Sequence, residues 1–179
     1  MTVDQALFLL EFLLPQLESE QAVTQRILLS VPPEQESYRP NPKGKSAFEL
    51  ARHIATTEFW LLDAVIDRRF GEIAHLPGSM STCPQIAEWY AENWQQRLPA
   101  LKKLSGEELV TPVDFIGLRH DPAVAYLNIA IRHSVHHRGQ LSAYLRAMGA
   151  RVPAIYVESA DEPYPGDEPV SAAYRPPAF

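Results

Sequence analysis

Apolar residues recur every three or four positions through the N-terminal segment of the chain. They are Leu7, Leu10, Leu14, Leu17 and Leu28. This spacing places them on one face of a helix. Thr2 followed by Gln5 has the pattern of a capping box, in which each side chain bonds the backbone of the other residue. We therefore predict a helix from about Val3 to Leu29, with a kink at Pro15.

The same pattern predicts three further helices, over residues 46–70, 82–104 and 121–149. Ser46 with Glu49 forms a second capping-box pattern at the start of one of them. Asp121-Pro122 is a typical start signal for the last helix, and Gly149 a typical stop. Residues 107–120 lack a helical period, and we expect a short extended or hairpin-like insertion there.

Four long amphipathic helices predict an all-α fold, a four-helix bundle with long connecting loops. We expect residues 1–150 to form this bundle and the proline-rich residues 151–179 to lie on it as an irregular tail. The hydrophobic pattern leaves open which helices are neighbours.

Composition narrows the possible partners and location. The chain has 179 residues and a formal net charge of −6, with no basic stripe, so we expect no nucleic-acid partner. No apolar run approaches the roughly 20 residues that a membrane span needs, and the N-terminus does not resemble a secretory signal. We therefore expect a cytoplasmic protein without a membrane contact. Cys83 is the only cysteine, so a metal would be held mainly by His, Asp or Glu.

Three histidines are the main candidates for chemistry. His133 and His137 are one helical turn apart, and the helix face that carries them is largely apolar, so both should point into the bundle. His53 lies in another predicted helix. If the two helices pack together, three imidazoles converge and leave one coordination position open, which is typical of a catalytic metal centre.

His136 competes with His137 for the role of ligand, because residues three apart are also neighbours on a helix. The residue seven positions after His137 is Tyr144, whereas the one seven after His136 is Ala143, which favours His137 on the apolar stripe. The alternative without a metal is a surface pair or hydrogen-bonded core histidines.

Three segments together resemble the DinB-like family. The segment from His133 to Gln140, which contains His136-His137-Arg138-Gly139, resembles the signature of that family's last helix. Residues 48–55, which end with Arg52-His53-Ile54-Ala55, resemble the histidine motif of its second helix. Tyr38-Arg39-Pro40 in the preceding loop is similar as well. The resemblance extends in order and spacing from about residue 3 to residue 150.

The resemblance implies a four-helix bundle with a metal site on His53, His133 and His137 that holds nickel, zinc or another divalent ion. It implies a small-molecule substrate, because related enzymes transfer low-molecular-weight thiols, as bacillithiol and mycothiol S-transferases and thiol-dependent maleylpyruvate isomerase do. Other members are described as metal-dependent hydrolases. The family is named for induction by DNA damage, which implies a stress response, and it favours a homodimer.

We therefore expect a metal-dependent enzyme that activates water or a low-molecular-weight thiol for hydrolysis or S-transfer. Candidate proton-transfer or supporting residues are Glu49, Glu58, Tyr126 and Tyr144; helix capping by Glu49 and core packing by the tyrosines are the alternatives. The other interpretation is a non-enzymatic bundle that binds a metal or small ligand and acts through a partner.

The first predicted helix has more apolar positions than one core-facing stripe requires. Phe8, Leu9 and Leu13 lie beside Leu10 and Leu14. Spare apolar positions of this kind favour a homodimer formed by helix faces.

Overall fold

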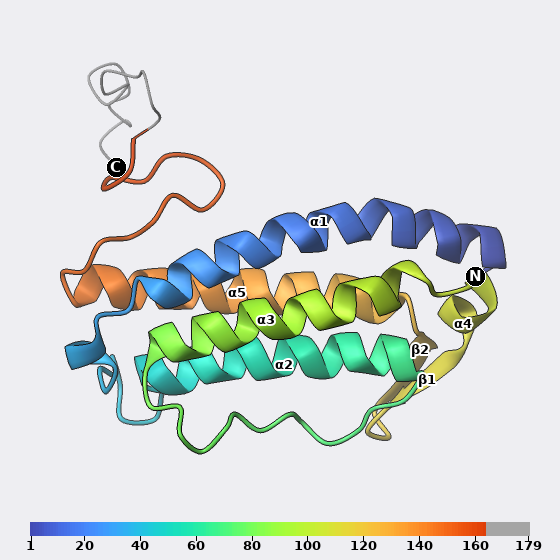
Figure 1. Cartoon of the computed structure of the whole chain (residues 1–179), viewed down its shortest axis with the longest axis horizontal. Helices are drawn as coiled ribbons and strands as arrows, with labels where there is room; N and C mark the ends of the chain where they lie inside the picture. Colours follow the sequence, from blue (N-terminus) through green and yellow to red (C-terminus); the bar gives the residue numbers. More distant parts are fainter. Residues whose placement is uncertain (164–179) are drawn as a thin grey trace, which may run out of the picture.

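The computed structural model describes residues 1–163, and four long helices form its body (Figure 1). They are α1 (Val3–Leu29), α2 (Ala47–Asp67), α3 (Cys83–Lys102) and α5 (Ala125–Ala147). The predicted all-α four-helix bundle is therefore confirmed. Helix α1 continues through Pro15 to its predicted end.

Capping boxes define where three of these helices begin. Thr2, Ser46 and Thr82 each accept a hydrogen bond from the backbone N–H three residues later, and the side chain at that later position bonds back to the cap. In this way, two otherwise unpaired backbone N–H groups receive a hydrogen-bond acceptor at the start of each of these helices. Helix α2 ends at Asp67 instead of the predicted Phe70, because Arg68 takes a left-handed conformation with φ of 56°.

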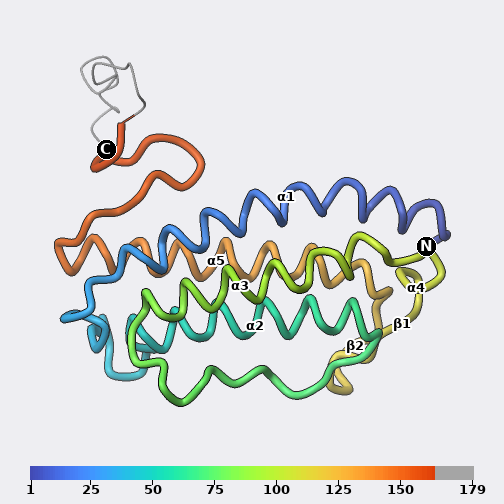
Figure 2. The backbone as a smooth tube through the Cα atoms, in the orientation of Figure 1, coloured from blue at the N-terminus to red at the C-terminus, as the bar shows by residue number. Residues whose placement is uncertain are grey.

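The helices are not arranged around the bundle in chain order. Helix α1 packs against α3 and α5, and α2 packs against the same two helices. The long connection between α2 and α3 returns along the length of the bundle, so these two helices run in the same direction (Figures 1 and 2). Helix α5 runs antiparallel to α2 and packs along it.

Short elements fill the connections. A 3-10 turn, η1 (Pro33–Gln35), precedes α2, and α4 (Gly106–Val110) leads into the antiparallel hairpin of β1 (Pro112–Phe115) and β2 (Arg119–Pro122). The predicted hairpin-like insertion is confirmed for residues 112–120, whereas residues 107–110, also predicted to be non-helical, belong to α4.

The predicted start of the last helix at Asp121-Pro122 is wrong. Asp121 pairs with Val113 and Pro122 with Pro112 in the hairpin, so α5 begins at Ala125. The sequence signal for a helix start is overridden here by strand pairing.

Residues 151–163 carry no helix and form the isolated bridge Ser159–Glu162. The backbone N–H of Val152 donates to Asp161, and Tyr156 reaches the bundle, where its hydroxyl contacts Glu20. The remaining part of the predicted tail, residues 164–179, lies outside the described residues.

Two features of the surface bear on the expected partners. Phe8 and Phe12 on α1 are 65% and 59% exposed, with their rings stacked, and the expected homodimer stays a prediction. Within residues 1–163, no helix is both long and apolar enough to cross a bilayer.

Candidate metal centre

His53, His133 and His137 meet where the first half of α2 packs against the middle of α5. The Nε2 atom of His53 lies 3.1 Å from Nε2 of His137 and 3.1 Å from Nε2 of His133. One ligand atom from each ring lies within 4.8 Å of the others, and all three side chains are partly buried. The upstream histidine therefore joins the pair on α5 in one cluster.

Protein groups orient two of these rings from the outside. The Nδ1 atom of His53 lies 3.1 Å from the hydroxyl of Thr57, one turn further along α2. The Nδ1 atom of His137 lies 3.1 Å from the Oε1 atom of Gln140. A side-chain amide oxygen only accepts hydrogen bonds, so Nδ1 of His137 carries the proton and its Nε2 lone pair faces the cluster. Within residues 1–163, the buried Nδ1 of His133 has no partner.

The surroundings keep the three imidazoles neutral. Burial, together with the nearby His137 and Lys45, lowers the pKa of His53 to about 4. Burial and the neighbouring histidines lower the pKa of His133 to about 3. Burial also lowers the pKa of His137, although its contact with Gln140 opposes the shift. Neutral imidazole is the form that binds metal ions.

The cluster fits a divalent metal ion. Zinc–nitrogen bonds of about 2.0–2.1 Å place two nitrogens of a tetrahedral site about 3.3 Å apart. The Nε2 atom of His53 lies at a similar distance, 3.1 Å, from the Nε2 atoms of His133 and His137. Lone pairs that face each other at this distance repel unless a proton or a cation lies between them. Imidazole nitrogen suits zinc and nickel, so the donor set matches the expected metals without distinguishing them.

Tyr144 joins this arrangement indirectly. Its hydroxyl lies 3.3 Å from the Nε2 atom of Gln140, which donates to it, and donates in turn to the carbonyl oxygen of Lys45 at 3.2 Å. A chain of hydrogen bonds thus runs from His137 through Gln140 and Tyr144 to the start of α2. Tyr144 supports the cluster from behind and does not contact its Nε2 atoms.

Glu49 and Tyr126 are held elsewhere. Glu49 completes the capping box of α2 and pairs with Arg39 at 2.8 Å; the bond from Ser46 and the charge of Arg39 lower the pKa of its carboxyl. The hydroxyl of Tyr126 donates to the carbonyl oxygen of Val113 in the hairpin at 3.0 Å. These contacts match the alternatives of capping and packing.

Glu58 lies deep in the bundle, in what we call the Glu58 network: Glu58, Tyr90 and Ser134. The hydroxyl of Tyr90 donates to one carboxyl oxygen at 2.6 Å, and the hydroxyl of Ser134 donates to the other. Burial raises the pKa of this carboxyl, and the two donors oppose the rise. The network ties α2 to α3 and α5 through the side chain of Glu58.

The two other polar residues of the α5 motif have different positions. The ring of His136 lies beside that of His137, with 4.7 Å between centroids, but His136 does not belong to the cluster. Arg138 is 1% exposed and pairs with Glu20 on α1. It also donates to Thr24 at 3.2 Å and to Tyr156 at 2.7 Å, which ties the segment after α5 to α1.

Sequence reasoning missed Thr57 as the partner of His53, although its position four residues later is a signal that could have found it. It also did not pair Glu58 with Tyr90 and Ser134, because residues on three helices share no pattern along the chain.

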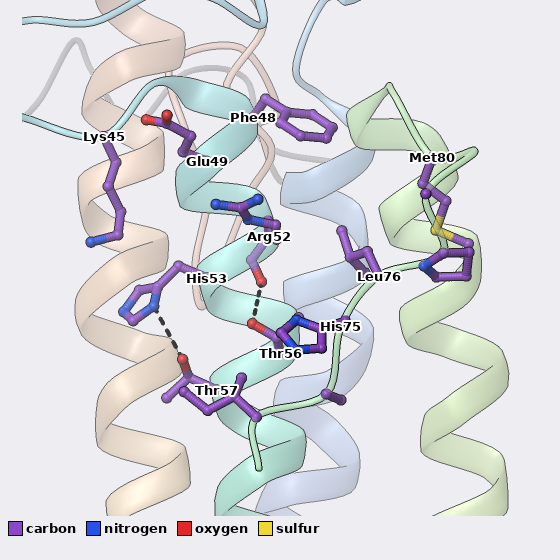
Figure 3. A pocket seen from close by; sticks show the side chains of 14 residues that line it. Lys45, Phe48, Glu49, Arg52, His53, Thr56, Thr57, His75, Leu76 and Met80 are labelled. Carbon is purple, nitrogen blue, oxygen red and sulfur yellow. Dashed lines mark hydrogen bonds between the residues drawn. The ribbon is translucent and has the colours of Figure 1, made fainter.

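Two hollows reach the histidine cluster. The first, here the polar hollow, has a volume of about 560 Å³ and lies between α2 and residues 73–80 of the following connection. His53 lines it, and Lys45 extends along it from the start of α2 toward His53 (Figure 3). The second, here the aromatic hollow, has a volume of about 540 Å³ and is lined by His133; Thr57 lines both.

The chain that forms this bundle has known relatives. The sequence matches the DinB family over residues 5–168, and the chain belongs to this family. The uncharacterized protein YjoA of Bacillus subtilis is 28% identical over 134 residues, which are 73% of this chain and 85% of that protein.

Solved structures agree with the family. The crystal structure of the DinB-like protein YjoA from Bacillus subtilis has a TM-score of 0.66 at 25% identity and covers 80% of this chain and 96% of its own. A DinB-like protein from Bacillus cereus has a TM-score of 0.70 at 28% identity, with 82% and 97% covered.

Proposed function

We propose that this protein is a metal-dependent enzyme in which His53, His133 and His137 hold one divalent ion, nickel or zinc. The observation that carries the proposal is the convergence of three Nε2 atoms, with 3.1 Å from His53 to each of the other two, beside two hollows. Three protein ligands leave a position for a further ligand, as in catalytic centres.

A divalent ion in such a site lowers the pKa of a water or thiol that it binds and so supplies a nucleophile near neutral pH. We propose hydrolysis or S-transfer from a low-molecular-weight thiol as the reaction. Both need an anionic nucleophile and a channel for a small substrate, and hollows of about 540 and 560 Å³ have the size of small-molecule sites.

The protein's own residues hold the ligands and set the charge around them. Thr57 and Gln140 orient the rings of His53 and His137 through Nδ1, as second-layer partners of metal ligands do. Lys45 brings a positive charge to the polar hollow near His53, where it favours an anionic nucleophile or substrate group.

The test combines metal content with activity. Protein purified without a His tag is loaded with Zn²⁺ or Ni²⁺ and assayed with a panel of low-molecular-weight thiols against a bimane electrophile, and with ester and amide substrates. We expect at least one reaction that chelation abolishes and the same metal restores. Activity that survives complete chelation, checked by elemental analysis, would rule out the metal mechanism. Bound metal without any turnover would favour the non-enzymatic binding bundle instead.

A further inference from the structure

The aromatic hollow lies between α2, α5 and the hairpin. His133 and Thr57 form the end of the hollow nearest the cluster, and Trp60, Phe115 and Tyr126 form much of its wall. Its volume of about 540 Å³ falls within the range of ordinary small-molecule sites.

The aromatic wall presents ring surface rather than polar groups. The indole N–H of Trp60 donates to the carbonyl oxygen of Gly71 at 2.7 Å, and the hydroxyl of Tyr126 donates to Val113 at 3.0 Å. The ring of Phe115 lies 5.7 Å from that of Trp60 and 6.3 Å from that of Tyr126, centroid to centroid. Because the polar atoms of these rings are already bonded within the protein, the wall suits a flat apolar group that stacks on it.

Positive charge gathers at the same hollow. Arg119 of the hairpin and Arg132 of α5 line it, and no Asp or Glu among residues 1–163 does. Arg119 already pairs with Asp121, whereas Arg132 has no ion pair among residues 1–163. Arg132 and His133 line the same hollow, so a group bound to the guanidinium of Arg132 lies in the space that reaches the histidine cluster.

The polar hollow differs in both respects. It contains an acid, Glu49, beside its cations, and its wall combines Phe48 with loop residues such as Ile73 and Pro77 instead of three large aromatic rings. An anion with a flat apolar body therefore has a better match in the aromatic hollow.

We propose that the aromatic hollow binds an organic carboxylate with a flat aromatic body, its carboxylate on Arg132 and its body against Trp60 and Phe115. The assignment as a substrate site rests on the proposed function, because it makes this molecule the partner of the nucleophile at the histidines. Binding itself rests only on the hollow.

The test measures binding of 2-naphthoate by isothermal titration calorimetry, with the neutral 2-naphthamide as a control ligand. We expect 2-naphthoate to bind and Arg132→Gln to weaken it by at least about tenfold, since a guanidinium–carboxylate contact is a charge-assisted hydrogen bond. Arg52→Gln, which changes an arginine of the polar hollow, is the matched control and should leave the affinity unchanged. Phe115→Ala should weaken both ligands.

Absence of 2-naphthoate binding, an affinity unaffected by Arg132→Gln, or an equal loss in Arg52→Gln would overturn the inference. Elemental analysis of the same samples separates this inference from the proposed function. A protein that binds metal but not 2-naphthoate refutes only the inference that the aromatic hollow binds a carboxylate. A protein that takes up no metal but binds 2-naphthoate through Arg132 refutes only the proposed metal-dependent enzyme.

Discussion

Two polar clusters lie next to each other in this bundle, and neighbouring residues of α5 serve them. Ser134 and Arg138 turn into the core, where Ser134 bonds Glu58 and Arg138 pairs with Glu20. His133 and His137, one residue earlier in each case, turn to His53.

The clusters differ in how their polar atoms are satisfied. Both carboxyl oxygens of Glu58 accept hydrogen bonds from protein hydroxyls, as buried polar groups in folded proteins generally do. Within residues 1–163, the Nε2 atoms of the histidines have only one another as hydrogen-bond partners, and the lowered pKa of each ring keeps the three imidazoles neutral and able to bind a metal ion. We infer that the first cluster stabilises the fold and that the second is built for a ligand.

The largest effect should come from removing a histidine of the cluster. We expect His137→Ala to lose most of the bound metal, from about one ion per chain, because one of three ligands is gone. His136→Ala is the matched control, since its ring lies beside the cluster without joining it. Elemental analysis of both variants measures the difference, and equal losses would show that the wrong neighbour has been chosen.

The core cluster should respond in stability instead. Arg138→Met leaves Glu20 without its buried partner, and we expect unfolding to become easier by about 3–5 kcal/mol in metal-free protein. Denaturant unfolding measures this, with Arg146→Met, which breaks an exposed pair with Asp161, as a control that costs about 0–1 kcal/mol. If Arg138→Met folds and fails to bind metal, the two clusters are not separable in the way proposed.

A smaller loss of metal affinity is expected when the residue that hydrogen-bonds a metal ligand is replaced. Gln140→Ala removes the acceptor that orients His137, and we expect metal affinity to fall by about 10–100-fold while binding persists. Gln16→Ala, which removes a side chain that bonds only its own helix, should not change the affinity. Competition with a chelator of known affinity measures the metal affinity of both variants. An unchanged affinity in Gln140→Ala would show that the hydrogen bond to Gln140 does not support metal binding by His137.

The mildest test uses pH. An unfolded imidazole gains a proton near its usual pKa of about 6.5, whereas the pKa values of His53 and His133 are about 4 and 3 in the fold. The unfolded state therefore binds more protons, and the stability of metal-free protein should fall as pH drops from about 6.5 toward 4. Unfolding measured across that window should show the loss, and a His53→Ala/His133→Ala variant should show less of it. An identical slope in both proteins would contradict the lowered pKa values.

The sequence predicts most of the helices but few of the contacts between segments that are distant along the chain. Capping boxes at Thr2 and Ser46 and the spacing of apolar residues are local signals, so they identify helices directly. The start of α5 was placed at Asp121-Pro122 because the pairing of these residues in the hairpin is not visible from local sequence.

The same limit applies to the candidate site. The motif around His133 and His137 is local, whereas His53 joins it only if two predicted helices pack together, which the family resemblance supports and local sequence does not show. The Glu58 network joins three helices, and the aromatic hollow joins α2, α5 and a hairpin, so both depend on a helix order that the hydrophobic pattern leaves open.

The central claim is that His53, far along the chain from the other two histidines, completes a metal centre with them. The most direct measurement is calorimetric titration of Zn²⁺ and Ni²⁺ into untagged, metal-free protein and into its His53→Ala variant. The account predicts about one tightly bound ion per chain in the natural protein, and loss of that tight binding in the variant with the fold retained by circular dichroism. Tight binding that persists unchanged without His53, or no binding by the natural protein, would contradict it.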